Sequence, residues 1–299
     1  MTHVVVAQTA GQLGNQLFLF AHLIAFAEEL NLEIHNTAFN EHRLHFYGTA
    51  QNLYARYPAG KRSPSTSALS VMAQIGGGRG MDLSSRLIRR VLPQRNPIIN
   101  SISCAGHMPK DDVDLADTHH QAILRSAPVA LLFGGRYRNY ELFSQHESKI
   151  REFLRFCNTL SSEQFMEPLR EKYDFIVSLH IRQGDYARFL DGKYYFDTSE
   201  YLAAAELILG KIDAKRPLIV ICSNAPQHVS EACSFEWVSG PGSVIGDMQI
   251  LAMSDLIIAV PSTFSRWASF IGRVPICYID KDGIVSRLAH GELPPPASH

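Results

Sequence analysis

Apolar strands alternate with helices through the second half of this 299-residue chain. Apolar runs bounded by turn residues predict strands over residues 175–181, 218–222, 256–260 and 275–279. The spacing of apolar side chains between them predicts helices over residues 199–210, 227–233, 247–253 and 264–271. This alternation is typical of a parallel sheet covered by helices, because parallel strands need a long crossover between them. The second half is therefore expected to be an α/β domain.

The first half carries a sparser version of the same pattern. Val4–Ala7, Leu32–His35 and Val129–Phe133 have the apolar character of buried strands. Leu17–Leu30 has helical spacing and is apolar on most sides, which favours a helix buried on most of its surface. We infer a second α/β half, without any internal repeat.

One segment is the expected boundary between the halves, and another is an expected loop within the first half. A helix is expected over residues 161–172, with Ser161 or Ser162 as its cap, and we infer a boundary between the halves near residues 155–172. Pro58–Asp82 is rich in Ser, Pro and Gly and includes a run of glycines. No Gly-Lys-Ser/Thr follows that run, so we interpret the segment as a loop or insertion and not as a phosphate-binding loop.

Composition excludes several classes of protein. With 46% hydrophobic residues the chain can bury a real core, and a net charge of −1 argues against nucleic-acid partners and against bulk binding to anionic membranes. No apolar run is long enough for a transmembrane segment, and the start of the chain has no signal-peptide pattern. The five scattered cysteines include no CxxC pair, which favours reduced thiols in the cytoplasm over disulfides or a zinc site.

The strand over residues 175–181 ends in polar residues that can carry chemistry. Its apolar residues alternate, so His180 and Arg182 are expected on the opposite face near the carboxyl end, where ligands bind in open α/β sheets. The guanidinium of Arg182 offers a planar fork for a phosphate group. A structural ion pair between Arg182 and Asp185 is an equally good interpretation of the motif alone.

Hydroxyl residues open the helix expected over residues 264–271. Ser262, Thr263 and Ser265 follow a strand that Pro261 ends, and free N–H groups at a helix start attract anions. Taken alone, the sequence is explained more simply by an ordinary helix cap at Ser262 or Thr263.

Two more segments are weaker candidates. In Gly11–Asn15, the glycines (Gly14 among them) allow close approach of a ligand, and Asn15 can donate to a phosphate, although an ordinary turn is the simpler interpretation. The carboxylate of Asp247 can accept two hydrogen bonds from the N1–H and N2–H₂ edge of guanine. Its position suits an N-cap aspartate equally well.

Taken together and in this order, these pieces resemble the bacterial α-1,2-fucosyltransferase family, which is glycosyltransferase family 11-like. The family begins with a Gly-Asn-Gln-hydrophobic-Phe segment, and its later signatures are His-x-Arg-Arg-Gly-Asp-Tyr and Asn-Ser-Thr-Phe-Ser-Trp-Trp. The matching segments here are Ala10–Phe18, a diverged Phe133–Phe143, His180–Tyr186 and Asp247–Trp267. The resemblance spans residues 4–280 but is dense only in these segments.

The resemblance implies an α/β, GT-B-like fold with two Rossmann-type domains facing a cleft. Residues 1–160 would form the acceptor-side domain and residues 161–299 the domain that binds a GDP-sugar. It also implies inverting, metal-independent transfer of fucose from GDP-fucose, without a separate cofactor. The acceptor would be an oligosaccharide or a lipid-linked glycan, modified at O2 of galactose, and peripheral membrane association stays open.

The resemblance also assigns roles to single residues. Arg182 would hold the β-phosphate, Asp247 the guanine, and Asn15, beside Gly14, would approach the diphosphate from the first domain. The hydroxyl residues Ser262, Thr263 and Ser265 would line the diphosphate. For the acceptor proton the candidates are Asp185, which can instead position Arg182, and His180, which can instead be a positioning or structural group.

Departures from the family pattern keep alternatives open. Gln183 stands where the family has a second arginine, and Pro261 and Arg266 replace Asn and Trp. Ser223-Asn224 stands in place of the family's acidic segment after a strand. A transferase for another GDP-sugar and a non-catalytic protein that binds nucleotide sugars or glycans are therefore the competing hypotheses. An NAD-dependent enzyme is disfavoured, since no GxGxxG follows a strand.

Overall fold

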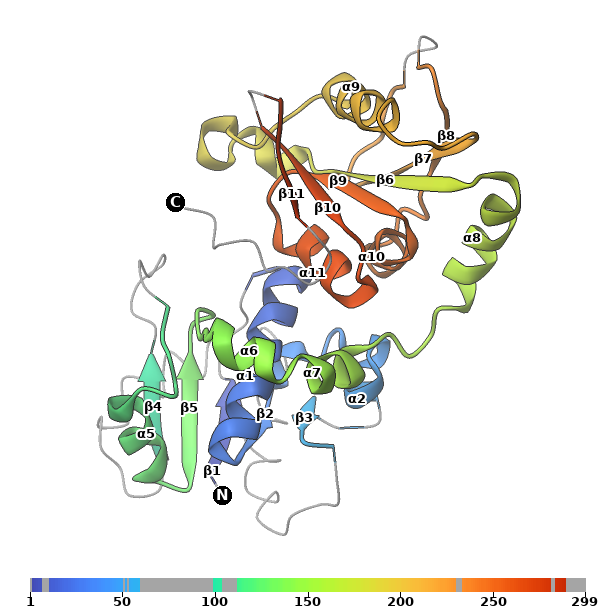
Figure 1. Cartoon of the computed structure of the whole chain (residues 1–299). Coiled ribbons are helices and arrows are strands. Elements are labelled where there is room, and N and C mark those ends of the chain that lie inside the picture. Colours follow the sequence, from blue (N-terminus) through green and yellow to red (C-terminus); the bar gives the residue numbers. More distant parts are fainter. Residues whose placement is uncertain are drawn as a thin grey trace. The chain divides into compact units, whose positions relative to one another are not determined.

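The computed structural model divides the chain into two compact units, Met1–Asn158 and Thr159–His299. It describes residues 2–6, 11–50, 52, 54–59, 99–103, 112–229, 233–280 and 283–288. Each unit has its own sheet, made mostly of parallel strands with helices packed against it (Figure 1). The predicted α/β class is confirmed for both halves. The loop predicted over Pro58–Asp82 lies outside the described residues, apart from its first two positions.

The first unit is built on a sheet with the strand order β3-β2-β1-β5-β4. Its strands are β1 (Thr2–Val6), β2 (Leu32–His35), β3 (Arg56–Tyr57), β4 (Ile99–Ser103) and β5 (Val129–Phe133). All neighbours pair in parallel except β2 and β3, which are antiparallel. The three strands predicted in this half are confirmed, whereas β3 and β4 were not predicted.

Helix α1 (Leu13–Leu30) is the central helix of the first unit. Nearly all of its residues from Leu13 to Ala27 are buried, as its apolar sequence predicts. It contacts β2 and the helices α6 (Tyr140–Gln145) and α7 (Glu147–Leu154). It begins at Leu13 and not at the predicted Leu17, so Gly14 and Asn15 belong to its first turn and not to the turn before it.

Short helices complete the described part of the first unit. They are η1 (Thr37–Phe39), η2 (Arg43–His45), α2 (Tyr47–Ala50) and α5 (Thr118–Arg125). Helix α5 contacts β4 and β5, and α2 contacts α7.

The second unit is built on a sheet with the strand order β11-β10-β9-β6-β7-β8. Its strands are β6 (Phe175–Ile181), β7 (Pro217–Ser223), β8 (Glu236–Ser239), β9 (Leu256–Ala259), β10 (Ile276–Asp280) and β11 (Gly283–Leu288). All neighbours are parallel except β10 and β11. Four of these strands were predicted to within about one residue at each end, and β8 and β11 were missed.

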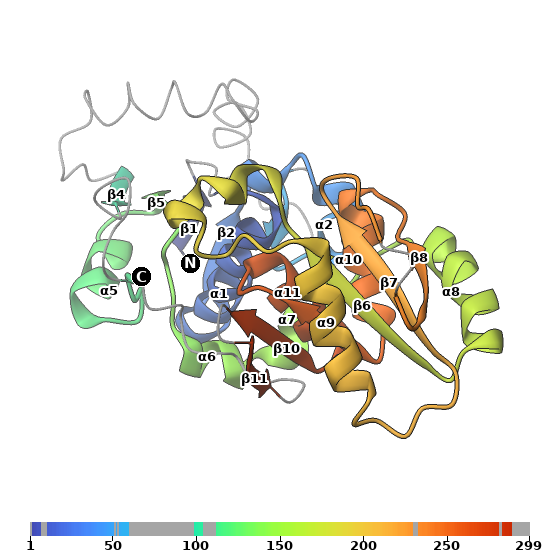
Figure 2. The ribbon, with the colours of Figure 1, turned by 90° about the horizontal axis from the view of Figure 1, so that it is seen from above.

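Helices cover both faces of the second sheet. They are α8 (Leu160–Lys172), α9 (Thr198–Leu209), α10 (Val244–Met253) and α11 (Thr263–Gly272), with the short turns η3 (Gly184–Ala187) and η4 (Phe189–Gly192) between β6 and α9. Helix α9 packs on one face, and α10 and α11 pack on the other (Figure 1). Figure 2 looks onto the face that α9 covers.

Two helix predictions in this unit were wrong in detail. Thr159, and not Ser161 or Ser162, is the N-cap residue of α8. Ser162 is instead buried and donates a hydrogen bond to Gln249 on α10 at 2.6 Å. A helix was also expected over residues 227–233, but residues 227–229 are irregular, and residues 230–232 lie outside the described part.

The second sheet has a topological switch point between β6 and β9. From β6 the chain moves outward to β7 and β8, and it then returns to β9 on the other side of β6. The connection after β6 leads to α9 on one face, and the connection after β9 leads to α11 on the opposite face. Diverging connections leave a crevice beyond the carboxyl ends of such strands, and this is where open α/β sheets bind ligands.

Among the described residues, no helix is long and apolar enough to cross a membrane.

The close packing of α10 against α11 depends on a missing side chain. A Cβ atom at Gly272 would lie 2.1 Å from the carbonyl oxygen of Ala252 and 2.6 Å from its Cα. Gly272→Ala should therefore lower the free energy of unfolding by about 1–3 kcal/mol, because the backbone of α10 must move away. Chemical denaturation followed by circular dichroism measures the change.

Gly210→Ala is the matched control, since the nearest atom to its added Cβ, the carbonyl oxygen of Glu206, lies 3.3 Å away. A Gly272→Ala protein as stable as Gly210→Ala would show that the two helices are not held this closely.

Candidate functional site

Two of the predicted segments meet at the switch point of the second sheet. Strands β6 and β9 pair in parallel with His180 opposite Ala259, so Arg182 and Pro261 each follow that pair by two residues. The start of α11 therefore lies at the same edge of the sheet as Arg182. The hydroxyl of Tyr201, buried on α9, lies against the backbone of both Arg182 and Val260, and burial raises its pKa. Tyr201 thus spans the ends of both strands.

His180 is a buried, neutral group beneath this edge. The apolar residues of β6 face the α9 side, while His180 faces α11 and stacks on Phe264 with 4.8 Å between ring centroids. Burial, with the charge of Arg182 adding to it, lowers the pKa of His180 to about 3. Its Nδ1 atom is buried and makes no hydrogen bond with any described residue. The imidazole is therefore a weak base that stays uncharged at neutral pH.

Arg182 is a half-buried cation at the tip of β6. Its guanidinium carbon lies 4.9 Å from the centroid of the Tyr186 ring, within the range of a cation–π contact. Asp185 lies in η3, but its side chain is outside the described part of the structure. The predicted ion pair between Arg182 and Asp185 therefore stays untested, as does a catalytic role for Asp185.

Gln183, at the position where the family pattern has an arginine, makes hydrogen bonds to the segments before α9 and after β7. Its backbone N–H donates to Asn224 Oδ1 at 2.9 Å, and its side-chain amide donates to the carbonyl of Phe196 at 3.2 Å. Its Oε1 accepts a hydrogen bond from Gln227 at 3.1 Å. Gln183 thus joins the ends of β6 and β7, and its neutral amide is used in protein contacts.

Of the hydroxyl residues at the start of α11, Ser262 and Ser265 bond to each other, whereas Thr263 is partly exposed. Ser262 is the N-cap residue, and its hydroxyl accepts the backbone N–H of Ser265 at 3.2 Å, so the simpler capping interpretation is confirmed. Ser265 is fully buried and donates to the carbonyl of Ser262 at 3.3 Å. Thr263 is partly exposed and is the first residue of the helix. No acidic residue occupies the first turn, so the positive end of the helix dipole is not neutralised there.

Asp247 lies further along the same edge, beside the ends of β7 and β8. It is buried in the first turns of α10 and accepts the N–H of Gly242 at 2.9 Å. It is not an N-cap residue, because Ser243 caps α10. Burial raises the pKa of Asp247 to about 6, and the Gly242 hydrogen bond opposes that rise. A Cβ at Gly240 would lie 3.2 Å from Asp247 Oδ1, so the glycine leaves this carboxylate room.

Gly14 and Asn15 belong to the first unit, whereas all the other predicted site residues belong to the second. Gly14 is buried and Asn15 is exposed in the first turn of α1, close after β1. Gly11 has a positive φ of 63°, and a Cβ there would lie 2.5 Å from the side-chain nitrogen of Asn15. A glycine is therefore required at Gly11 for the Asn15 side chain to fold over this turn.

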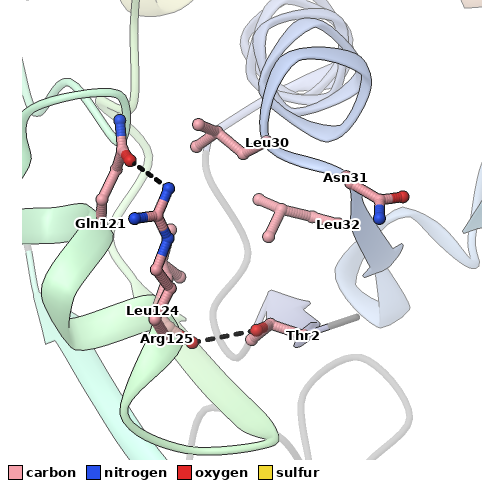
Figure 3. Close-up of a pocket in the computed structure, with 7 residues that line it drawn as sticks. All are labelled: Thr2, Leu30, Asn31, Leu32, Gln121, Leu124 and Arg125. Carbon is pink, nitrogen blue, oxygen red and sulfur yellow. Dashed lines mark hydrogen bonds between the residues drawn. The ribbon is translucent and has the colours of Figure 1, made fainter.

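A small pocket in the first unit is not part of this site. It lies at the amino ends of β1 and β2, between the end of α1 and α5 (Figure 3). Two hydrogen bonds join residues that line this pocket. Thr2 Oγ1 donates to the carbonyl of Leu124 at 3.0 Å, and Arg125 donates to the side chain of Gln121 at 2.7 Å. Its volume of about 180 Å³ is below the roughly 300–1,000 Å³ of ordinary ligand pockets.

The family of the chain is decided by a match over residues 110–281 to the family model described as Glycosyl transferase family 11. This is more than half of the chain. The chain belongs to glycosyl transferase family 11. The matched region contains His180–Tyr186 and Asp247–Trp267, the segments on which the sequence resemblance depends most.

Solved structures share the fold of this family 11 protein. POFUT1 in complex with GDP-fucose matches with a TM-score of 0.53 and 14% identity, over 91% of this chain and 94% of that chain. A mutant of Arabidopsis thaliana FUT1 in complex with GDP matches with a TM-score of 0.54 and 11% identity, over 93% and 70%. No curated protein sequence matches significantly. The structural matches confirm the predicted GT-B-like fold class.

Two residues of this edge were missed at the level of sequence. Tyr201 was hidden in an alanine-rich helix, where an aromatic residue predicts only core packing. Asn224 was noted only as a departure from the family pattern, although its side chain both accepts from and donates to the Gln183 backbone. No sequence spacing indicates either contact, because both join segments that become neighbours only in the sheet.

Asp247 should make the stability of the protein depend on pH. Its folded-state pKa of about 6 lies above the ordinary aspartate value of 3.8, so the protonated form is favoured by folding. The stability of the wild type should therefore fall as the pH rises through this window. Relative to wild type, Asp247→Asn should be about 1–3 kcal/mol more stable near pH 7.5, and much of that difference should vanish near pH 4.5. Urea denaturation at both pH values measures it.

Asp213→Asn, which removes an exposed carboxylate, is the control and should show no such pH-dependent gain. A constant difference between Asp247→Asn and wild type at both pH values would contradict the raised pKa.

Proposed function

We propose that the chain transfers fucose from GDP-fucose to a hydroxyl of an acceptor glycan, with the donor bound at the carboxyl edge of the second sheet. The observation that carries the proposal is the placement of Arg182 and the start of α11 side by side at the switch point. Membership of glycosyl transferase family 11 supports sugar transfer. GDP and GDP-fucose occur in structures of proteins with the same fold, which supports this donor class.

The diphosphate is proposed to bind between Arg182 and α11. The guanidinium gives two parallel hydrogen-bond donors to phosphate oxygens, and the free N–H groups at the helix start add more. Thr263 supplies an accessible hydroxyl, while Ser262 and Ser265 keep the first turn in shape through their mutual hydrogen bonds. Ser265 is too buried to contact a ligand without rearrangement, so its proposed contribution is indirect.

The guanine is proposed to bind at Asp247. Strands lie about 4.8 Å apart, so a site beside β7 and β8 lies roughly 5–10 Å from the tip of β6. An extended nucleoside diphosphate covers this span. One oxygen of Asp247 already accepts the Gly242 N–H, and the carboxylate retains acceptor capacity for guanine donors. Those donors favour the ionised form and would offset the cost of burying the charge.

The proposed chemistry is inverting and needs no metal. Negative charge that develops on the departing GDP is stabilised by Arg182 and the α11 dipole, which are fixed before reaction. Asp185 is the proposed acceptor of the proton from the attacking hydroxyl, or the group that orients Arg182. His180 is proposed as a neutral support beneath the site, because its low pKa makes it a poor base. Asn15 and Gly14 stay proposed ligands of the diphosphate on the family resemblance alone.

The acceptor is proposed to be a galactose-terminated oligosaccharide or lipid-linked glycan, with transfer to O2. This assignment comes from the family resemblance. A panel of GDP-sugars with galactose-terminated acceptors, read by GDP release and by mass spectrometry of the product, tests donor and acceptor together. GDP binding without transfer or hydrolysis of any donor would favour a non-catalytic binding protein instead.

Arg182→Ala should reduce kcat/KM for GDP-fucose by roughly 10²–10³, equivalent to about 2.7–4 kcal/mol of transition-state stabilisation, because the phosphate loses its preorganised cation. Arg182→Lys should recover only part of the activity, since an ammonium cannot form the planar fork. GDP-release kinetics with purified protein measure both variants.

Arg216→Ala provides the control. This arginine is exposed and directly precedes β7, so it lies at the amino ends of the strands, opposite to the proposed site. Circular dichroism of each purified variant checks that it is folded. Turnover of Arg182→Ala close to that of Arg216→Ala would exclude Arg182 from the site.

Removal of divalent metals should leave fucose transfer unchanged. Within the described residues of the second unit, no three His, Cys, Asp or Glu side chains converge as metal ligands. Initial rates after treatment with EDTA, and again after addition of Mg²⁺ or Mn²⁺, measure the dependence. A loss of rate in EDTA that Mn²⁺ restores would contradict the proposal.

A further inference from the structure

Two strands of the first unit bring three potential metal ligands together. In the parallel pair of β1 and β2, His3 lies opposite Glu33, and His35 lies two residues further along β2. Neighbours in register and residues two apart on one strand point to the same face of a sheet. His3, Glu33 and His35 therefore share one face, opposite the face of the buried Val4 and Ile34.

The distances within this cluster fit a tetrahedral ion. His3 Nδ1 lies 3.3 Å from His35 Nε2 and 3.6 Å from Glu33 Oε2, and His35 Nε2 lies 3.2 Å from Glu33 Oε1. Ligand atoms about 2.0–2.1 Å from a Zn²⁺ ion at tetrahedral angles are about 3.3–3.4 Å apart. One ligand atom from each of the three side chains lies within 4.8 Å of the others. The side chains are thus close to the positions that one ion requires.

One ligand atom has charged neighbours but no hydrogen bond among the described residues. The Glu33 side chain is only 9% exposed. Its Oε1 atom is buried and makes no hydrogen bond with the described residues. Arg56 on β3 approaches it at 3.5 Å, which neutralises charge without a hydrogen bond of good geometry. A buried carboxylate oxygen without a hydrogen bond is costly, and a bound cation would remove that cost.

We propose that His3, Glu33 and His35 form a zinc site in the first unit, at the centre of the β1–β2 pair. Two imidazoles and one carboxylate form a known type of zinc ligand set, and they leave a fourth position for water. Arg56, 3.5 Å from Glu33 Oε1, would hold the carboxylate in place, as outer partners of metal ligands do. The ion would join neighbouring strands and contribute to stability. None of these residues belongs to the proposed donor site, so the inference is independent of the proposed function.

Zinc binding is tested with the full chain, prepared without a histidine tag and freed of metal by a chelator. Calorimetric titration with Zn²⁺ should show one ion bound per chain and a higher Tm with zinc than without it. Substitution with Co²⁺ should give the intense visible absorption of a tetrahedral site with nitrogen and oxygen ligands.

The variants His3→Ala, Glu33→Gln and His35→Ala should each weaken Zn²⁺ binding at least about tenfold and abolish the zinc-dependent rise in Tm. His119→Ala is the control, since it removes an exposed histidine from α5 next to His120. If the variants of the more buried Glu33 and His35 do not fold, His3→Ala and the Co²⁺ spectrum of the wild type still decide the question.

Two outcomes would overturn the proposal. Absence of Zn²⁺ binding by the wild type would mean that the four side chains form a closed network of ion pairs and hydrogen bonds. Binding that His119→Ala weakens and His3→Ala does not would place the ion at surface histidines.

Discussion

The parallel pairing of β6 with β9 is the constraint on which the candidate site depends. It sets the register of His180 against Ala259 and so brings the residues that follow each strand to one edge. The connections then leave toward opposite faces, which is the arrangement in which open α/β sheets bind ligands beyond the strand ends. The buried hydroxyl of Tyr201 lies against the backbone of both strand ends. A shift of one residue in this pairing would turn β6 over and place its polar side chains on the α9 face.

Burial favours the neutral form of two ionisable groups at this edge, His180 and Asp247. His180 loses basicity, and Asp247 becomes a weaker acid, because burial disfavours charge of either sign. The consequences differ. A neutral imidazole stacked on Phe264 packs like any aromatic side chain, whereas the ionised Asp247 reduces stability until donors approach it. The proposed guanine supplies such donors, so the same carboxylate costs stability in the free protein and contributes to affinity in the complex.

The sequence predicts the second sheet well where strands are fully buried. β6 was predicted from Phe175 to Ile181 because its apolar residues are bounded by polar ends, and its limits were confirmed. β8 (Glu236–Ser239) was missed because it lies at the sheet edge and is largely exposed, so it lacks an apolar run. The start of α1 was placed too late because Gly14 favours a turn in isolation, whereas tertiary packing buries it in the helix.

The candidate site could be predicted only in part. Arg182 and Thr263 were predicted from strand and helix ends, and the register of β6 and β9 places both at one edge of the sheet, while their role stays a prediction. The linkage of Gln183 to Asn224, 41 positions apart, depends on the neighbouring positions of β6 and β7. The cluster of His3, Glu33 and His35 depends likewise on strand register. Glu33 and His35, two residues apart, share one face of a strand, but the sequence does not show that His3 lies beside them on the neighbouring strand.

His180 Nδ1 in the second unit and Glu33 Oε1 in the first unit are both buried without a hydrogen bond to a described residue, but they lie in different parts of their sheets. His180 lies near the carboxyl ends of β6 and β9, beneath the proposed diphosphate site. In the first unit Glu33 lies within the pairing of β1 and β2, two inner strands of their sheet. The closest ligand atoms of His3, Glu33 and His35 are only 3.2–3.6 Å apart, which leaves no space between them for an organic ligand. A single ion is small enough to bridge the three side chains, so the proposed ligands of the two units differ: a nucleotide at the strand ends of one and a metal ion on the sheet face of the other.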